Sequence, residues 1–484
     1  MTHCTKEIHV TVLAQSLVDG RWESHAQQAD VTNPADGSVV GQVAWGTADD
    51  AVRAADAAAA ALQEWAERPA RSRADILRDA ADLMSSRVDD IGRLLALEAG
   101  KRLPEAVGEV AFSAEYFRWF AEEARRPEGS VIPHEARDRR HLTLRQPVGV
   151  VASLTPWNFP CSIQARKLAP ALAAGCTVVA RVSEKAPLAV TELVRCLVDA
   201  GVPAGVVNLV HGPARPVTQA LLDHHAVRAV SFTGSTQVGS EIMASAARRV
   251  VRPLLELGGD AAFIVFEDAD LDAAVEGAML AKFRNTGQSC IAANRFVVHE
   301  SVYDEFTGRL SQAVDAMSIG DGLADPLPDL GPVIDQSRVD AVQGMVDAAL
   351  EAGATRLTRD FDLPGQGTFV APALLADVPD DAALSCSEVF GPAAAVFRFR
   401  DDEEAVARAN ATEMGLAGYL WSRDVGRVWR TAERLQAGII GANNALPSVC
   451  FAPMGGVKQS GLGREGASAG LEEFQDVRYL SLGL

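Results

Sequence analysis

A cysteine in a polar loop is the strongest candidate for chemistry in this chain. Cys290 lies in the stretch KFRNTGQSCIAANR, residues 282–295, after a polar run whose glycine lets backbone approach a ligand closely. The run comes directly after an apolar helical stretch, residues 271–283. A thiol presented there among backbone N–H groups can lose its proton, and the thiolate is the nucleophile of cysteine catalysis. The alternative is a buried structural cysteine, the commoner role of this residue type.

Glu256 and Asn158 are the next candidates. Glu256 stands in the apolar run PLLELGG, and a carboxylate in such a run is costly unless it is paired or functional. Burial would raise its pKa towards neutrality, which suits a general base, whereas an inward ion pair is the alternative. Asn158 lies between two prolines in TPWNFP, where an asparagine that completes a turn is the alternative to one with a role in chemistry.

The elements that must position these residues follow an alternating pattern. Between residues 148 and 266, short β-branched runs alternate with helical ones: VGVVASL, TVVAR, VVNLV, AVSFTG and AAFIVF. This pattern is typical of a parallel sheet covered by helices, as in a dinucleotide-binding domain. A second set of strands and helices follows from about Asp260 to Leu446 and carries Cys290. We expect two α/β domains with the site in the cleft between them.

Scaffold helices and a projecting arm are predicted outside these runs. Thr47 and Asp50 have capping-box spacing before an alanine-rich helix that ends at Pro69, and one further helix with a single buried face is predicted over residues 72–101. Residues 125–146 predict a β-hairpin that leaves the domain, and residues 477–482 alternate like a strand.

Two glycine-containing segments compete for the cofactor phosphates. Residues 461–466, GLGREG, match GxGxxG literally, but the fingerprint needs a preceding strand and a following βαβ unit, which this segment lacks. Gly234, Ser235 and Thr236 instead follow the strand AVSFT and open a helix. Backbone N–H groups at that helix N-terminus can hold a pyrophosphate without a basic residue; a plain strand-to-helix turn is the alternative.

Composition excludes several other classes of function. The chain has 484 residues, 48% of them hydrophobic, and a net charge of −19, which disfavours nucleic acid as a partner. No apolar run approaches a membrane span, and the first residues lack the apolar core of a signal peptide, so we expect a cytoplasmic protein without a membrane partner. Seven scattered cysteines and nine histidines form no ligand pattern, so we expect no metal.

Five motifs in order give the chain a resemblance to a known family. The cysteine loop and LELGGD resemble the two signatures of the NAD(P)-dependent aldehyde dehydrogenase superfamily, and TPWNFP, SFTGSTQVG and EVFGP fall where that family places them. The resemblance implies an α/β fold with a Rossmann-type cofactor domain (1–124 and 147–258), a catalytic domain (259–460) and a β oligomerisation arm (125–146 and 470–484). It also implies a homodimer or homotetramer.

The resemblance assigns roles within an aldehyde oxidation. Cys290 is the implied nucleophile, Asn158 and the Cys290 N–H are the implied oxyanion donors, Glu256 is the implied base, and Lys167 supports the site. NAD is the expected cofactor, because Glu184 would repel the extra phosphate of NADP. Arg181 stands where the family usually has lysine and favours NADP, which stays the alternative. The implied cofactor-binding residues are Pro156, Trp157, Arg181, Ser183, Glu184, Gly234, Ser235, Leu257, Glu388 and Phe390.

Three residues predict an anionic substrate. Arg166 and Arg284 flank the motifs, and guanidinium groups bind carboxylates in a bidentate way. Succinate-semialdehyde dehydrogenases, which the sequence resembles most, use matching arginines and a serine matching Ser448. Succinate semialdehyde is therefore the expected substrate. Glutarate semialdehyde, a sulfonated aldehyde such as sulfolactaldehyde, and a broad range of aldehydes are the alternatives.

Several departures and rival functions bear on this reading. Ala292 replaces the second cysteine of some relatives and excludes a local disulfide switch, and Pro447 and Cys450 alter the wording around Ser448. Asp260 stands where relatives more often have asparagine, lysine or serine.

Two other functions compete with this one: an acylating dehydrogenase that transfers the acyl group to coenzyme A, and a fold kept for binding alone. Glu256 argues against the first, and the presence of all three catalytic candidates argues against the second.

Overall fold

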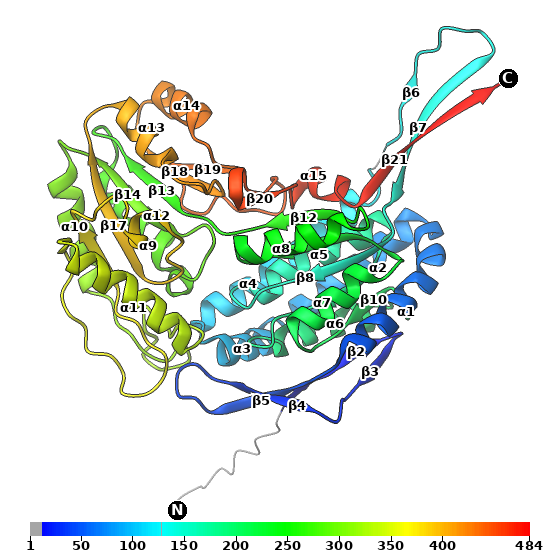
Figure 1. Cartoon of the computed structure of the whole chain (residues 1–484), viewed down its shortest axis with the longest axis horizontal. Helices are drawn as coiled ribbons and strands as arrows, with labels where there is room; N and C mark the ends of the chain where they lie inside the picture. Colours follow the sequence, from blue (N-terminus) through cyan, green and yellow to red (C-terminus); the bar gives the residue numbers. More distant parts are fainter. Residues whose placement is uncertain (1–11, 127) are drawn as a thin grey trace, which may run out of the picture.

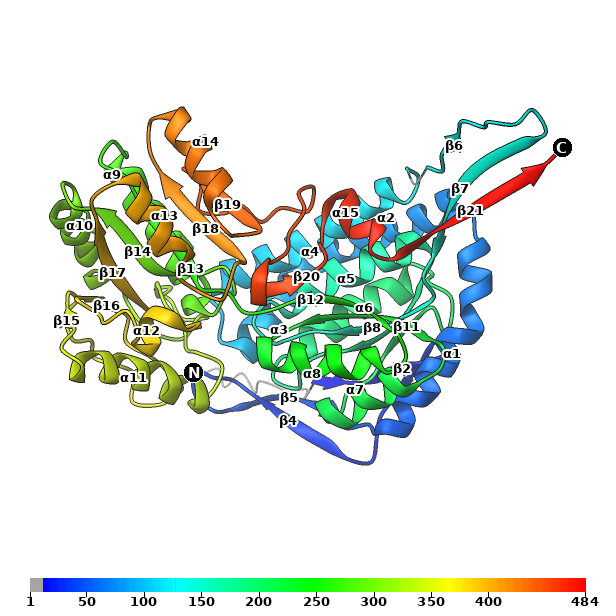
Figure 2. The ribbon, with the colours of Figure 1, turned by 45° about the horizontal axis from the view of Figure 1, so that its top comes forward.

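Two sheets and their helices form the body of the protein. The computed structural model describes residues 12–126 and 128–484. In Figures 1 and 2 the sheet that contains β8 and the sheet that contains β13 lie side by side, and β7 and β21 project together from the body. Cys290 lies in the loop between α9 and β14 of the second sheet.

The first sheet has a parallel centre of five strands. Its order is β20-β12-β11-β8-β9-β10-β2-β3, in which β2, β3 and β20 pair antiparallel to their neighbours. Its strands in chain order are β2 (Ser16–Val18), β3 (Arg21–Glu23), β8 (Val150–Leu154), β9 (Thr177–Arg181), β10 (Val207–Leu209), β11 (Val227–Thr233), β12 (Arg252–Glu256) and β20 (Gly461–Leu462).

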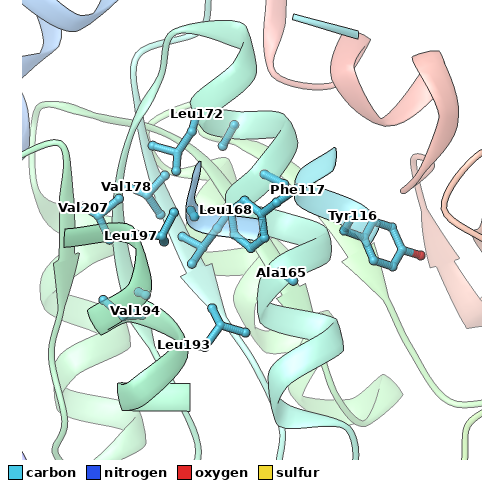
Figure 3. Packing of buried hydrophobic residues seen from close by; sticks show 14 of the residues in the cluster. Tyr116, Phe117, Ala165, Leu168, Leu172, Val178, Leu193, Val194, Leu197 and Val207 are labelled. Atoms are coloured by element: carbon cyan, nitrogen blue, oxygen red, sulfur yellow. The ribbon is translucent and has the colours of Figure 1, made fainter. Parts of the chain in front are cut away.

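Helices cover this sheet, and one of them is buried along its whole length. Every residue of α5 (Pro160–Ala174) is buried, so its polar side chains need internal partners. Its core contacts, which include Leu168 and Phe117, are drawn in Figure 3. The other helices are α1 (Ala48–Glu67), α2 (Ala70–Ser86), α3 (Val88–Ala99), α4 (Leu103–Glu123), α6 (Leu188–Asp199), α7 (Ala214–Asp223) and α8 (Thr236–Ala247).

The second sheet is parallel except at one edge. Its order is β15-β16-β17-β14-β13-β18-β19, and only β15 is antiparallel. The strands are β13 (Ala261–Val265), β14 (Ala293–His299), β15 (Thr355–Arg356), β16 (Ala373–Ala376), β17 (Ala393–Phe399), β18 (Ala417–Trp421) and β19 (Ile439–Ala442). The helices are α9 (Leu271–Phe283), α10 (Tyr303–Asp315), α11 (Gln336–Glu351), α12 (Ala383–Cys386), α13 (Asp402–Asn410) and α14 (Val425–Arg434).

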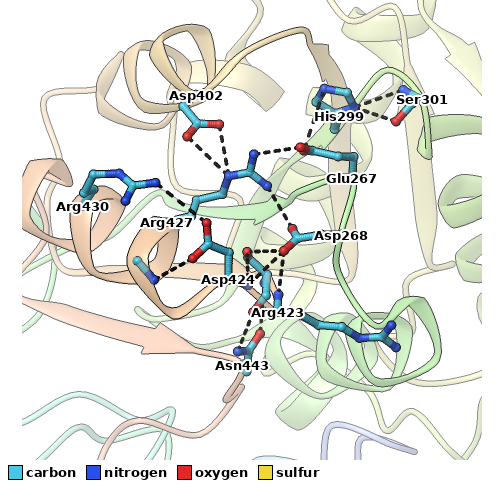
Figure 4. A network of polar contacts seen from close by, with 12 residues as sticks. Glu267, Asp268, His299, Ser301, Asp402, Arg423, Asp424, Arg427, Arg430 and Asn443 are labelled. Atoms are coloured by element: carbon cyan, nitrogen blue, oxygen red, sulfur yellow. Dashed lines mark hydrogen bonds and ion pairs between the residues drawn. The ribbon is translucent and has the colours of Figure 1, made fainter.

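An arginine-centred network ties the far end of this sheet to its helices. Arg427 of α14 pairs with Glu267 at 2.7 Å, Asp268 at 3.0 Å and Asp402 at 3.3 Å (Figure 4). Single exposed ion pairs contribute little, but one guanidinium shared among three carboxylates fixes the end of β13 relative to α13 and α14.

Two smaller sheets complete the chain. Near the N-terminus β1 (Val12–Ala14), β5 (Val39–Ala44) and β4 (Gln28–Thr32) form one sheet. The projecting arm consists of β6 (Val131–Ile132), β7 (Arg139–Pro147) and β21 (Gln475–Gly483), with β21 antiparallel to β7 along nine residue pairs from Gln475↔Pro147 to Gly483↔Arg139. The predicted hairpin and C-terminal strand are therefore both present.

Two expectations about the scaffold are wrong. The single helix predicted over 72–101 is broken at Arg87, which has φ −111° and ψ 14°. A straight helix of that length would extend for about 45 Å, and the break lets both halves pack against α6. The run AAFIVF, grouped with the first sheet, is β13 at the centre of the second. Periodicity identifies a buried strand but not the sheet to which it belongs.

Candidate active site

The loop before Cys290 has an unusual backbone that its own side chains hold. Asn285 and Thr286 have φ of 52° and 55°, a left-handed conformation that costs free energy in non-glycine residues. Asn285 Nδ2 donates to the carbonyls of Asn158 at 3.0 Å and Gln288 at 3.1 Å, and Thr286 Oγ1 donates to the carbonyl of Gly331 at 3.0 Å. The polar residues that precede the cysteine in the sequence therefore fix the loop that presents it.

Asn158 faces the same loop from the N-terminal end of α5. Its Nδ2 donates to the carbonyl of Gln288 at 3.2 Å, and the residue is only 3% exposed. A residue that served only a local turn between the flanking prolines would bond within its own segment. This amide instead reaches across 130 residues to the loop of Cys290, which is where an oxyanion donor is needed.

Glu256 ends β12 and is 3% exposed. Neither of its carboxylate oxygens has a hydrogen-bond partner among the described residues, and no ion pair to it is present there. Burial, reinforced by the nearby Glu465 carboxylate, raises the pKa of Glu256 well above its usual value. A buried carboxyl without partners and with raised proton affinity fits a general base rather than a structural ion pair.

Lys167 is held by two groups that sequence reasoning missed. Its Nζ donates to Glu465 Oε1 at 2.6 Å and to Ser231 Oγ at 2.9 Å. Glu465 is 2% exposed and belongs to the segment GLGREG. That segment is no phosphate loop: β20 is a two-residue antiparallel edge strand, and the helix after it, α15 (Ala467–Glu472), has six residues. In the sequence, the position of Glu465 among closely spaced glycines is the signal that could have indicated its buried role.

The pKa of the Cys290 thiol is higher than that of an ordinary cysteine. Burial raises its pKa to about 12, and the Glu388 carboxylate acts in the same direction, whereas Arg166 lowers it. In the free protein desolvation therefore outweighs the backbone N–H groups that favour the thiolate. The thiol is neutral at rest and needs a base or a bound partner to become the nucleophile.

Cys290 opens into a pocket of about 440 Å³. Arg166 and Ser448 line it together, with Arg166 Nη2 at 3.5 Å from Ser448 Oγ. Arg284 also lines this pocket, with its guanidinium carbon 5.2 Å from the centre of the Phe159 ring. The structure thus brings the three predicted substrate residues to one cavity with the nucleophile.

The predicted phosphate segment joins β11 to α8. Ser235 caps the helix by accepting the Val238 N–H at 3.4 Å, and the Gly234 N–H donates to the Glu256 carbonyl at 3.0 Å. A Cβ on Gly239 would lie 2.3 Å from a methyl of Leu257, so this glycine lets α8 pack against the end of β12. The helix N-terminus remains open for an anion.

A second cavity of about 590 Å³ lies beside this helix and is lined by Arg181, Phe232 and Val238 among others. Arg181 donates to Glu184 Oε2 at 2.5 Å and to the Gly212 carbonyl at 3.0 Å, while its Nε has no partner among the described residues. Arg181, which favours NADP, and Glu184, which favours NAD, therefore neutralise each other's charge.

The remaining cofactor candidates gather between the two sheets. Glu388 accepts the Gly259 N–H at 3.2 Å, and burial raises the pKa of its carboxyl to about 7. The rings of Trp157 and Phe390 meet edge to face with centroids 5.5 Å apart. Pro156 lies next to Trp157 and is partly buried, and Ser183 is buried in the turn after β9. The cavity beside α8, the N-terminus of that helix and the Glu388 carboxylate offer groups that suit the parts of a dinucleotide.

Asp260 makes a buried ion pair next to the site. Its Oδ2 lies 2.9 Å from Arg295 Nε, and both side chains are at most 5% exposed. The pair joins the start of β13 to the start of β14. This contact gives the buried Asp260 carboxylate a cationic partner.

The family model for the aldehyde dehydrogenase family matches residues 22–480. The chain belongs to the aldehyde dehydrogenase family.

Several similar proteins are named as dehydrogenases of small acidic aldehydes. The chain is 45% identical to succinate-semialdehyde dehydrogenase [NADP(+)] GabD of Escherichia coli (strain K12), over 97% of this chain and 98% of that protein. It is 45% identical to glutarate-semialdehyde dehydrogenase of Pseudomonas aeruginosa, over 97% of each chain. It is 43% identical to 3-sulfolactaldehyde dehydrogenase of Pseudomonas putida, again over 97% of each chain.

Solved structures share the fold of this aldehyde dehydrogenase. The crystal structure of an Escherichia coli NADP-dependent enzyme matches with a TM-score of 0.96 and 45% identity over 98% of both chains. The predicted fold class and enzyme class are confirmed. None of the helices in residues 12–126 and 128–484 has the length and apolar character needed to cross a membrane.

Proposed function

We propose that this enzyme oxidises an aldehyde with an anionic tail, above all succinate semialdehyde to succinate, with NAD or NADP as the oxidant. The observation that carries the proposal is the convergence of Arg166, Arg284 and Ser448 on the pocket of Cys290. Two guanidinium groups in a mostly apolar cavity favour a ligand that brings a negative charge. The named activities of the relatives support the same class of substrate.

The chain's residues divide the reaction into two halves. Cys290 attacks the aldehyde carbon after its proton is removed, and Asn158 Nδ2 with the Cys290 N–H stabilises the oxyanion that forms. A nicotinamide cofactor held by the residues named below would supply the acceptor for the hydride. Glu256 then takes a proton from the water that hydrolyses the thioester, which its raised pKa suits. Lys167 and Glu465 form a buried ion pair whose charges act on Glu256.

The cofactor would lie along the residues that the sequence assigns to it. Ser235 and the N–H groups at the start of α8 would hold the pyrophosphate, Arg181 and Glu184 would meet the adenosine ribose, and Glu388 would meet the nicotinamide ribose. Because Arg181 pairs with Glu184, the acidic side chain is less able to exclude a 2′-phosphate, which supports use of NADP beside NAD.

Domain boundaries, assembly and location complete the proposal. We divide the chain as the sequence predicts, at residues 258 and 460 and with the arm at 125–146 and 470–484.

The arm exposes apolar side chains, among them Val131 at 76% and Val477 at 57%, which supports a homodimer or homotetramer joined through it. Light scattering of the full chain and of a chain ending at residue 474 tests the arm, and an unchanged mass would count against it. The cytoplasm is the expected location, to be checked by cell fractionation.

A substrate panel tests the activity. We expect kcat/KM for succinate semialdehyde to exceed that for butanal by at least about tenfold, which corresponds to about 1.4 kcal/mol of transition-state binding. Glutarate semialdehyde and a sulfonated three-carbon aldehyde test the alternatives. Equal values for succinate semialdehyde and butanal would indicate a broad-specificity enzyme and would remove the role of the arginines.

A further inference from the structure

Helix α4 presents two carboxylates, one turn apart, to the pocket of the nucleophile. Glu105 and Glu109 are four residues apart, so their side chains lie on the same face of the helix. Both line the pocket into which Cys290 opens. Neither carboxylate has a part in the reaction steps of Cys290, Asn158 and Glu256, and a pocket for an anionic substrate favours positive side chains. The hydrogen bonds of the two carboxylates indicate a different role.

Glu109 holds the start of α5 from outside that helix. Its Oε1 accepts the N–H groups of Cys161 at 3.0 Å and Ser162 at 3.2 Å. N–H groups in the first turn of a helix have no acceptor within the helix, and Phe159, which precedes α5, provides no side-chain cap. Asn158 comes directly before Phe159 in the chain. The Glu109 carboxylate therefore fixes the end of α5 to which Asn158 is attached.

Glu105 holds the loop of the nucleophile in the same way. Its Oε2 accepts the backbone N–H of Asn285 at 3.2 Å. Asn285 has a φ of 52°, and an acceptor fixed on a neighbouring helix helps to hold this costly conformation. The side chain of Asn285 in turn donates to the carbonyls of Asn158 at 3.0 Å and Gln288 at 3.1 Å. Glu105 therefore supports the loop that leads to Cys290.

We propose that Glu105 and Glu109 are positioning residues that set the place of Asn158 relative to Cys290. The two carboxylates leave α4 about 6 Å apart along its axis, which is four residues at about 1.5 Å each. One holds the segment of Asn158 and the other holds the loop of Cys290, and the Asn158 amide donates to the Gln288 carbonyl between them at 3.2 Å. The acceptor oxygens perform this role, and the negative charges do not. The inference rests on the proposed function, because it needs Asn158 as the oxyanion donor.

A double-mutant cycle with Asn158→Ala tests Glu105. Glu105→Ala leaves the Asn285 N–H without its acceptor and should lower kcat by about 10- to 100-fold for succinate semialdehyde and butanal alike, because misplacing a reacting group by about 1 Å costs about 100-fold. Glu105→Gln keeps an acceptor oxygen without the charge and should restore kcat to within about threefold of the original. In the Asn158→Ala enzyme, Glu105→Ala should lower kcat by less than about threefold, because the group that it positions is absent.

Glu109 is tested together with Lys101, since the two form an ion pair with side chains only 2% and 1% exposed. Removing one member alone would leave an uncompensated buried charge. Lys101→Met with Glu109→Gln keeps an acceptor for the N–H groups of α5, whereas Lys101→Met with Glu109→Leu does not. The second double variant should have a kcat about tenfold below the first. Glu115→Ala is the control, because it removes an exposed carboxylate of the same helix and should leave kcat unchanged. Urea denaturation of each variant shows whether it is folded.

Equal falls caused by Glu105→Ala in the original and the Asn158→Ala enzymes would overturn the positioning role, and so would equal falls for Glu105→Ala and Glu105→Gln. A change confined to succinate semialdehyde would show that Glu105 acts on the anionic tail and would overturn it as well. The two Lys101→Met variants need no change at Glu105, and equal kcat values for them would refute the role of Glu109. Full activity of Asn158→Ala would remove the proposed oxyanion donor and this inference together, whereas additive effects would remove only the inference.

Discussion

Gly259 offers a sharp test of how closely the two catalytic segments pack. An added Cβ at this position would lie 2.1 Å from the carbonyl oxygen of Cys290 and 3.2 Å from Leu416 Cβ. Real Cβ atoms essentially never come closer than 3.0 Å to such a neighbour. Gly259→Ala must therefore separate the backbone at Gly259 from that at Cys290 by about 0.9 Å, the difference between 3.0 and 2.1 Å. The contact joins the backbone of residue 259 to the backbone of Cys290, so no flexible side chain can move away to relieve it.

A displacement of this size translates into a large loss of rate. Misplacing a reacting group by about 1 Å typically costs about 100-fold, so kcat/KM for succinate semialdehyde should fall by about 100-fold, or about 2.7 kcal/mol. The Gly259 N–H also donates to Glu388, so the KM for the cofactor should rise as well.

The assay combines steady-state kinetics with urea denaturation, so that a folded but inactive enzyme is recognised. Gly344→Ala is the control, because a Cβ there meets nothing within 4 Å in the middle of α11. This control should keep full activity and gain about 0.4–1 kcal/mol of stability. A folded Gly259→Ala enzyme with activity within about threefold of the original would refute the packing argument.

Two further substitutions test single interactions. Asn158→Ala should lower kcat by about 100- to 1000-fold while the thermal midpoint changes little, because it removes an oxyanion donor; a smaller loss than about tenfold would assign Asn158 to the turn. Glu98 is fully buried, and desolvation raises its pKa from 4.5 to about 8 although it accepts the N–H groups of Leu188 and Ala189. Between these pH values the folded state holds a proton that the unfolded state releases, so stability should fall by up to about 1.4 kcal/mol per pH unit as pH rises. Urea titrations of Glu98→Gln should lack this component of the slope, and an identical slope in both proteins would contradict it.

Sequence reasoning succeeded where the decisive interactions are local. The helix over 271–283 and the capping box at Thr47 depend on residues close to each other in the sequence, and both are present in the structure. The placement of Arg166, Arg284 and Ser448 in one pocket came from resemblance to a family, since nothing in their spacing brings them together.

What could not be predicted depends on burial and on distant partners. Glu465 meets Lys167 across 298 residues, and only the complete burial of α5 makes that pairing necessary. The raised pKa of the Cys290 thiol is likewise a property of the folded surroundings, because a polar loop in the sequence does not reveal how much water it excludes. No proline or glycine stands at the break at Arg87, so the sequence contains no breaker that would have indicated it.

The position of Glu465 near the end of the chain has a consequence for biosynthesis. Lys167 emerges from the ribosome about 300 residues before its counterion, and β20 cannot complete the edge of the first sheet until Gly461 and Leu462 have been made. During that interval Lys167 lacks its ion-pair partner Glu465, so the first domain cannot reach its final packing while translation continues. A polypeptide that stops before Gly461 would contain Cys290, Glu256 and Asn158 and still lack a finished site. Such a truncated chain should therefore lack activity.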